Sequence, residues 1–208
     1  MSATATAMPA RMASARRLPV RPLVITAASL VAALVLAFVG SNLWTSLQQR
    51  DLARRFERTA ASWAGLDAVQ RSEVTVGSGA PLARIGIASI GLDAIVVEGA
   101  TPANMRRAPG HLTGSAMPGE SGVAIITANR VGFGGFFQRL DRLAVGDRIV
   151  TESPFGKTVY TVTEIGVVPA TELGLETDSS QRILMLFGSS RLVGGADRLV
   201  VRAVAGGA

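Results

Sequence analysis

The hydrophobic pattern begins with one long apolar run near the N-terminus. From Leu23 to Gly40 the chain has 18 residues without a charge. A helix needs roughly 20 mostly apolar residues to cross the ~30 Å hydrocarbon core of a bilayer. A cleaved signal peptide has a shorter core of ~7–15 residues and a small-residue exit, whereas bulky residues such as Trp44 follow this run. We therefore predict a retained transmembrane anchor over residues 23–43.

Apolar residues then recur at helical spacing between residues 43 and 69, with charges between them and no proline. The pattern predicts a helix with two interpretations. The helix is a stalk that lifts a domain off the bilayer, or it covers part of that domain or a partner; the stalk is favoured. The glycines and the proline of residues 77–81 predict a linker. Residues 44–81 thus form a stalk helix and linker.

Beyond residue 82 the pattern changes to short, β-branched apolar runs separated by Gly, Pro and Asp turns. The runs predict strands over residues 82–87, 94–98, 123–127, 148–152, 157–168, 182–187 and 198–204. Two short helices are predicted over residues 102–106 and 136–143. Short strands at this spacing are typical of a sandwich or barrel. Residues 82–208 are therefore predicted to form one mainly β domain.

Charge separates the first 22 residues from the rest. They hold four arginines and no acid, which accounts for +4 of the net charge of +6 and leaves +2 for the other 186 residues. That balance predicts no nucleic-acid partner. Residues 1–22 are predicted to stay in the cytoplasm by the positive-inside rule, with the β domain on the other side of the cell membrane. The four arginines at residues 50–58 lie among Asp51 and Glu57, so they oppose this orientation only weakly.

The rare residues limit the chemistry. The chain has no cysteine, which excludes disulfides, thiolate metal sites and a cysteine nucleophile. It has one histidine, His111, so a histidine-based zinc site is not expected. We predict no metal and no cofactor.

Three segments in order resemble the sortases, the surface-protein transpeptidases of mainly Gram-positive bacteria. Residues 84–93 read RIGIASIGLD and are similar to R-I-P-x-I-G-L-D. Residues 108–122 read APGHLTGSAMPGESG and are similar to G-P-G-H…G-T-A-x-P-G-x-x-G-N. Residues 137–147 read FQRLDRLAVGD and are similar to F-x-x-L-D-x-L-x-x-G-D. The chain is identified by these motifs as a sortase-like protein, similar to the membrane-anchored types of classes D and E.

The resemblance implies an eight-stranded β-barrel and a thiol mechanism, in which a cysteine attacks a backbone carbonyl and an amine resolves the acyl-enzyme. The family's histidine ends the strand I-A-G-H-R, here residues 126–130, and its position holds Asn129. The family's cysteine closes L-T-L-x-T-C, and the ungapped match to residues 183–188 gives Gly188. The family's arginine opens the last strand and matches Arg198.

These replacements change what the site can do. Gly188 has no side chain that attacks a carbonyl. Asn129 cannot serve as a general acid, a role typically worth ~10²–10⁴-fold, although its amide can hold a carbonyl in place. Arg198 retains the charged fork for an oxyanion or carboxylate, or forms a salt bridge with a neighbour such as Asp197 or Glu164.

Other residues provide alternatives. Ser189 follows Gly188, and a shifted mechanism would pair it with His111, which lies in the loop that borders the groove in sortases. The favoured interpretation is that the serine is a turn residue and His111 a hydrogen-bonding loop residue. Residues 132–137 read GFGGFF. There, Phe133 is the candidate for an exposed apolar lip that binds peptide, and Phe137 is expected in the core.

Three functions follow from this sequence. The first is an inactive pseudo-sortase that binds an extended peptide or surface-protein partner with a sorting-signal-like segment, through Asn129, Arg198, Phe133 and His111. The second is an active transpeptidase or hydrolase with Ser189 as nucleophile. The third is a structural barrel in a membrane complex.

Overall fold

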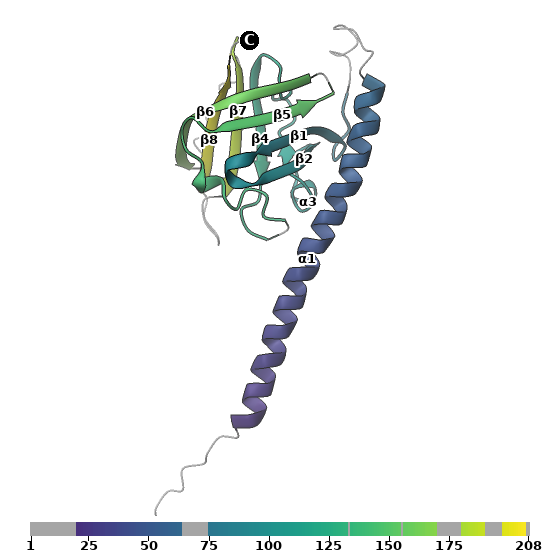
Figure 1. The fold of residues 1–208 in the computed structure, drawn as a ribbon, viewed down its shortest axis with the longest axis vertical. Helices are drawn as coiled ribbons and strands as arrows, with labels where there is room; N and C mark the ends of the chain where they lie inside the picture. The colour runs from purple at the N-terminus through teal and green to yellow at the C-terminus, as the bar shows by residue number, and fades with distance from the viewer. Residues whose placement is uncertain are drawn as a thin grey trace, which may run out of the picture. The chain divides into compact units, whose positions relative to one another are not determined.

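The computed structural model describes residues 20–63, 75–132, 134–154, 156–169, 180–189 and 197–206. In this part of the chain one long helix precedes eight strands that close into a barrel (Figure 1). This confirms the mainly β prediction. The elements are α1 (Val20–Trp63), β1 (Pro81–Ile87), η1 (Ala88–Ile90), β2 (Leu92–Glu98), α3 (Pro102–Met105), β3 (Gly110–His111), β4 (Gly122–Ala128), η2 (Leu140–Arg142), β5 (Arg148–Ser153), β6 (Gly156–Pro169), β7 (Arg182–Ser189) and β8 (Asp197–Ala205).

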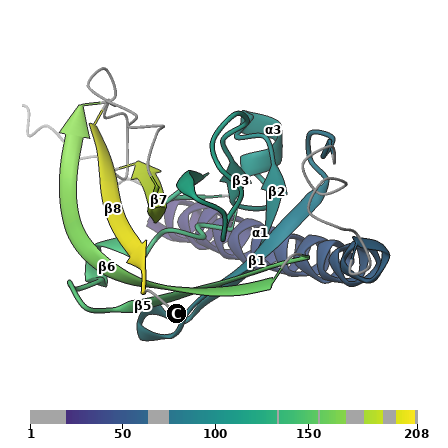
Figure 2. The ribbon, with the colours of Figure 1, turned by 90° about the horizontal axis from the view of Figure 1, so that it is seen from above.

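The strands are hydrogen-bonded in the order β1-β2-β3-β4-β7-β8-β6-β5, and β1 also pairs with β5. The pairs β2–β3 and β4–β7 are parallel, and the other neighbours are antiparallel. The long strands β6 and β8 run side by side (Figure 2). Because β4 and β7 are parallel neighbours, both end at the same edge of the barrel.

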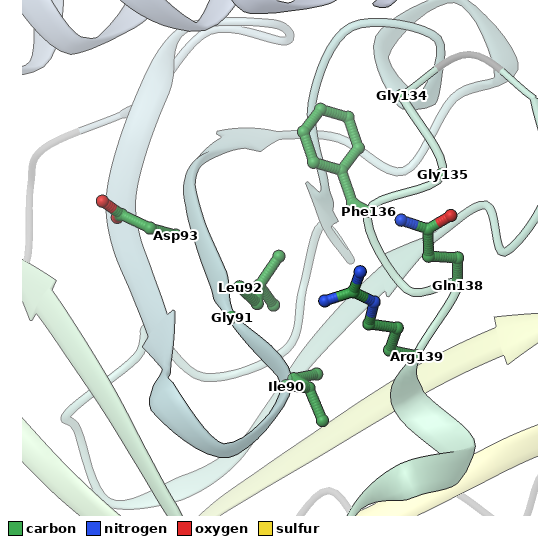
Figure 3. Close-up of a pocket in the computed structure, with 9 residues that line it drawn as sticks. All are labelled: Ile90, Gly91, Leu92, Asp93, Gly134, Gly135, Phe136, Gln138 and Arg139. Atoms are coloured by element: carbon green, nitrogen blue, oxygen red, sulfur yellow. The ribbon is translucent and has the colours of Figure 1, made fainter.

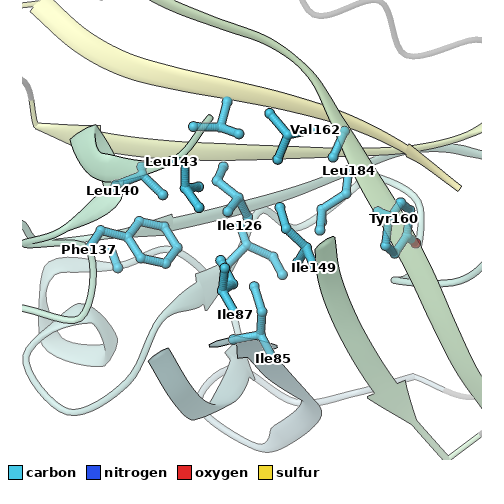
Figure 4. Close-up of a cluster of buried hydrophobic side chains, with 14 of the residues drawn as sticks. Ile85, Ile87, Ile126, Phe137, Leu140, Leu143, Ile149, Tyr160, Val162 and Leu184 are labelled. Atoms are coloured by element: carbon cyan, nitrogen blue, oxygen red, sulfur yellow. The ribbon is translucent and has the colours of Figure 1, made fainter. Parts of the chain in front are cut away.

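The barrel interior is filled by alternate residues of its strands. Ile85 and Ile87 of β1, Ile126 of β4 and Leu184 of β7 meet in one buried cluster (Figure 4). Their neighbours in sequence point outward, as strand geometry requires. Ile125 and Phe187 belong to a second cluster on the outer face of β4, β7 and β8. The sheet is therefore apolar on both faces in this region.

The N-terminal part of α1, up to Val39, forms a unit of its own. Its large apolar side chains are exposed; Leu36 and Phe38, for example, have relative accessibilities of 71% and 70%. The helix is long and apolar enough to cross a membrane.

From Gly40 onward, α1 belongs to the same unit as the barrel. Leu52 and Phe56 pack in a buried cluster with Ile95 and Val97 of β2. The Gln49 amide accepts a hydrogen bond from the Ile95 N–H at 2.7 Å and donates one to the Arg107 carbonyl oxygen at 2.9 Å. The structure therefore shows the second of the two predicted arrangements, in which the helix covers part of the β domain. Residues 64–69 of the predicted helix lie outside the described residues.

The predicted helix over residues 136–143 is not an α-helix. The segment forms turns followed by the short 3₁₀ helix η2. Its amides bond to carbonyls three residues back, as in Leu140 to Phe137 at 3.1 Å. Phe137, Leu140 and Leu143 all reach the barrel interior, so their spacing reflects burial of successive turns. Phe137 is buried in the core as expected.

Candidate functional site

Three strand ends meet at one edge of the barrel. Ala128 of β4 pairs with Gly188 of β7, and Asn129 directly follows this pair. On the other side of β7, Ser189 pairs with Arg198 of β8. Since neighbouring strands lie ~4.8 Å apart, the backbones of Asn129, Gly188 and Arg198 lie close together. The sequence matches thus bring their three positions to one place.

A cavity of about 230 Å³ opens beside these strand ends, on the outer face of β4 and β7. Arg198 contributes the one charged side chain that lines it in the described part of the chain. The other lining residues are uncharged: Ala100, Met105, Leu112, Ile125, Thr127 and Phe187. We call this the Arg198 cavity. Its apolar walls and its cation suit a ligand that is apolar in one part and anionic or strongly polar in another.

Asn129 is engaged with the wall of this cavity. Its Nδ2 donates a hydrogen bond to the Met105 carbonyl oxygen at 3.2 Å. Met105 is the last residue of α3 and lines the Arg198 cavity. The residue in the family's histidine position therefore connects the end of β4 to a groove wall.

The wall itself is fixed by further hydrogen bonds. The Thr101 side chain caps α3 by accepting from the Asn104 N–H at 3.2 Å. The buried Asn104 amide donates to the carbonyl oxygens of Glu98 and Gly99, each at 3.1 Å. A short helix fixed at both ends gives the cavity a preformed wall.

Gly188 faces the barrel side of β7. A Cβ built at Gly188 would lie 3.0 Å from Cγ and 3.1 Å from Cδ of Arg130, and 3.4 Å from Leu140. The Arg130 guanidinium forms an ion pair with Asp141 at 3.0 Å, which holds its stem there. The space that a side chain at position 188 would need is thus largely occupied.

His111 lies in a buried polar network with a relative accessibility of 2%. Its Nδ1 is 2.7 Å from Glu98 Oε2, and its Nε2 is 2.9 Å from the Ala116 carbonyl oxygen. Thr113 donates to the other Glu98 oxygen at 2.6 Å. The histidine's strand neighbour is Ile126, a core residue, while its sequence neighbour Leu112 lines the Arg198 cavity. Because paired residues share a face of the sheet, His111 faces away from that cavity.

Both ring nitrogens of His111 are therefore engaged inside this network. Ser115 Oγ, 2.9 Å from Nε2, gives its own hydrogen to the Leu112 carbonyl oxygen at 2.7 Å. A buried ring whose nitrogens are both engaged, on the face opposite the Arg198 cavity, is not placed to take a proton from a serine there. Burial alone raises the pKa of Glu98, but hydrogen bonds from His111 and Thr113 outweigh it and hold that pKa below its usual 4.5.

Two other candidate residues, Phe133 and Ser189, lie wholly or partly outside the described part of the chain. Phe133 lies outside the described residues, so the predicted lip stays a prediction. For Ser189 the backbone is described, as the last position of β7.

No hydrogen bond or ion pair joins Arg198 to Glu164 or to any other described side chain. The predicted alternative of a salt bridge with Glu164 is therefore absent among the described residues, and the alternative with Asp197 falls on a side chain outside them.

Another cavity, of about 310 Å³, lies between the η1–β2 turn and residues 134–139. Figure 3 shows Gln138 and Arg139 reaching toward the turn, while the Asp93 carboxylate points away. That carboxylate accepts two hydrogen bonds from Arg84, at 2.7 and 2.6 Å. None of the candidate residues that the structure describes lines this cavity, so we place the candidate site at the Arg198 cavity.

Sequence reasoning missed several residues of the site. Met105 and Arg130 act through a backbone oxygen and an aliphatic stem, which leave no mark in a motif. Glu98 had a signal: it stands 13 residues before the lone histidine, in an apolar strand where a buried acid needs a partner.

The comparisons with known proteins agree with this geometry. Residues 85–205 match the sortase domain family model. The structure is similar to a Clostridium perfringens sortase D5 transpeptidase, with 23% identity, a TM-score of 0.66, and 77% of this chain and 99% of that chain covered. It is also similar to a lid mutant of Streptococcus agalactiae sortase C1, with 26% identity, a TM-score of 0.59, and coverage of 78% and 90%.

A lid mutant of Corynebacterium diphtheriae sortase A matches with 24% identity and a TM-score of 0.58, over 66% of this chain and 74% of that one. No curated protein matches the chain. The family model covers more than half of the sequence. With the closed barrel and its converging strand ends, this shows that the chain belongs to the sortase family.

Proposed function

We propose that this protein is a membrane-anchored pseudo-sortase whose groove binds an extended peptide without transferring it. The observation that carries this is the hydrogen bond from Asn129 to the Met105 carbonyl oxygen. The position that handles protons in a reacting sortase has become a support for the groove wall. The chain also has no cysteine, and its one histidine is enclosed by Glu98 and Ala116.

The register of β7 supports a refinement of the nucleophile position. Ile183, Met185 and Phe187 all belong to the outer cluster on the cavity side. Gly188 faces Arg130 instead. Ser189 is the next position of β7, and its backbone pairs with Arg198 of β8 at the cavity. We infer that Ser189, rather than Gly188, stands where the family's cysteine stands.

A serine in that position is not sufficient for catalysis. A hydroxyl is a weak nucleophile unless a nearby base activates it. Asn129 is not a base, and both nitrogens of His111 are engaged in the Glu98 network on the other face of the sheet. Binding without an acyl-enzyme is what the remaining groups support.

The test uses the full chain in detergent micelles with sorting-signal-like peptides and an amine acceptor. The wild-type protein is expected to bind peptide reversibly, measured by fluorescence anisotropy, and to show no covalent adduct by intact mass. The double variant Asn129→His with Ser189→Cys is expected to gain thiol-dependent cleavage or transfer, because it restores a nucleophile and a proton donor in the groove.

The matched control is Asn129→His with Gly188→Cys. Its new side chain meets the Arg130 stem at 3.0 Å, so it is expected to stay inactive and to be less stable. Activity in this control and none with Ser189→Cys would reverse the position assignment. A covalent adduct on the wild-type protein, or no peptide binding at millimolar concentration, would contradict the proposed function.

We also propose that α1 anchors the protein with residues 1–22 in the cytoplasm and the barrel outside. The four arginines of that segment and the exposed apolar surface of α1 support this orientation. The natural absence of cysteine allows a clean test. A cysteine introduced at Val145, which is 68% exposed, is expected to react with a membrane-impermeant maleimide in intact cells. Reaction only after lysis would invert the topology.

A further inference from the structure

We propose that the Arg198 cavity binds peptides by their free C-terminal carboxylate. This inference rests on the proposed function and names the ligand class of the same groove. It starts from the state of Arg198, which is half-buried at the cavity and forms no hydrogen bond or ion pair with a described side chain. A partly desolvated guanidinium gains most from an anion that can accept two parallel hydrogen bonds.

The absence of a nucleophile and a base indicates what kind of anion Arg198 binds. In a reacting acyl transferase, negative charge develops on the carbonyl oxygen only after a nucleophile attacks it. Here Gly188 has no side chain, and neither Asn129 nor His111 can serve as the base that Ser189 would need. An uncharged backbone carbonyl would therefore stay uncharged beside Arg198. A ligand that already carries its charge satisfies this cation, and the end of a peptide chain does so.

The cavity lining supports a carboxylate over a more highly charged group. Among the described side chains that line the cavity, Thr127 is the one with a hydroxyl, and no described residue hydrogen-bonds to it. One guanidinium with one hydroxyl offers enough donors for a monoanion. A phosphate dianion would face the apolar side chains of Leu112, Ile125 and Phe187 with its remaining oxygens unsatisfied.

The size of the cavity fits a chain end. Its volume of about 230 Å³ is below the ~300–1,000 Å³ of pockets that enclose drug-sized ligands. The apolar walls then select an apolar side chain at or next to the C-terminal residue. The support from Asn129 and Asn104 keeps this space open in the absence of ligand.

The experiment compares matched fluorescein-labelled hexapeptides with leucine or valine at the last positions, measured by anisotropy with the full chain in detergent. One form ends in a free carboxylate and the second in a carboxamide. A third is amidated and has glutamate as its penultimate residue. The free acid is expected to bind about tenfold or more tightly than either amide, in line with the strength of charge-assisted hydrogen bonds.

Variants of Arg198 test whether this residue causes the preference for the free acid. Arg198→Gln is expected to reduce the advantage of the acid to within about twofold, whereas Arg198→Lys keeps part of it because the charge remains. Arg182→Gln is the matched control: it removes the same charge at the opposite end of β7, where Arg182 pairs with Gly122 of β4, and is expected to leave the advantage unchanged.

The outcomes are distinct. If acid and amide bind equally, or if the glutamate peptide matches the free acid, the C-terminal carboxylate assignment is wrong while the peptide-binding function stands. If no form binds at millimolar concentration, the proposed function itself fails. An acid preference that survives in Arg198→Gln would overturn the role of Arg198.

Discussion

Replacing His111 with alanine is expected to lower the free energy of unfolding by about 1–3 kcal/mol or more, the usual cost of leaving a buried acceptor unsatisfied, which is larger for a charged group. The variant leaves Glu98, which is 7% exposed, with only Thr113 as a side-chain donor. It also removes the donor that satisfies the Ala116 carbonyl oxygen. Urea titration of the full chain in detergent, followed by circular dichroism, measures the loss.

Two further variants distinguish the loss of the hydrogen bonds between His111 and Glu98 from the loss of side-chain volume. His111→Gln keeps hydrogen-bonding capacity and is expected to lose less stability than His111→Ala. A Glu98→Gln substitution in the His111→Ala background removes the unpaired charge and is expected to recover part of the loss. If His111→Ala is as stable as wild type, the network does not stabilise the barrel, and the histidine becomes a candidate for chemistry.

The same pair predicts how stability depends on acid. The pKa of Glu98 is held below its usual 4.5 in the folded protein. The folded state therefore binds this proton less readily than the unfolded state. The stabilisation is fully present above pH 4.5 and is lost as the pH falls through the lower folded value. This acid dependence is expected to shrink in Glu98→Gln, and an unchanged profile would assign it to other carboxylates.

Removing the Phe56 side chain by substitution with alanine is expected to cost about 3–5 kcal/mol, as for other buried aromatic residues. Phe56 is 5% exposed and packs on Ile95, Val97 and Ala108. Gln49→Ala is expected to cost about 1–3 kcal/mol, because it leaves the N–H of Ile95 without its side-chain partner. The same urea titration measures both.

The control for this helix is Glu57→Ala, next to Phe56 but on the exposed side, where a change within ±0.5 kcal/mol is expected. If Phe56→Ala behaves like this control, the helix is a stalk after all. If Phe56→Ala loses the expected stability, α1 is part of the folded domain. A soluble form must then start near Ser41 rather than after residue 63, so that the outer face of β2 stays covered.

Much of the barrel could be predicted from the sequence because its strands are long enough for a pattern to show. The run at 182–187 and the strand Arg182–Ser189 coincide apart from their ends. The two-residue strand β3 could not be predicted, since two residues have no periodicity. The segment after Phe136 was predicted as a helix because its buried residues recur at helical spacing, yet each turn closes on itself by local hydrogen bonds.

The site was predictable in its positions and not in its contacts. Motif order gave Asn129 and Arg198, and the parallel pairing of β4 with β7 explains why these distant positions meet. The motif match could not show which face of β7 position 188 occupies. That face is set by the alternation of β7, and the space on it is filled by the Arg130 stem, which comes from a different strand end. Nor could it show that the Asn129 amide reaches α3, a contact between residues 24 positions apart in sequence.

The place of β8 in the barrel has a consequence for biosynthesis. This strand is the last of the eight in chain order, yet it lies between β6 and β7 and hydrogen-bonds to both. A chain whose translation stops before Asp197 would leave two long strand edges unpaired, and such edges promote association with other chains. It would also lack Arg198. Synthesis through β8 is therefore needed before the barrel can close and Arg198 can take its place beside β7.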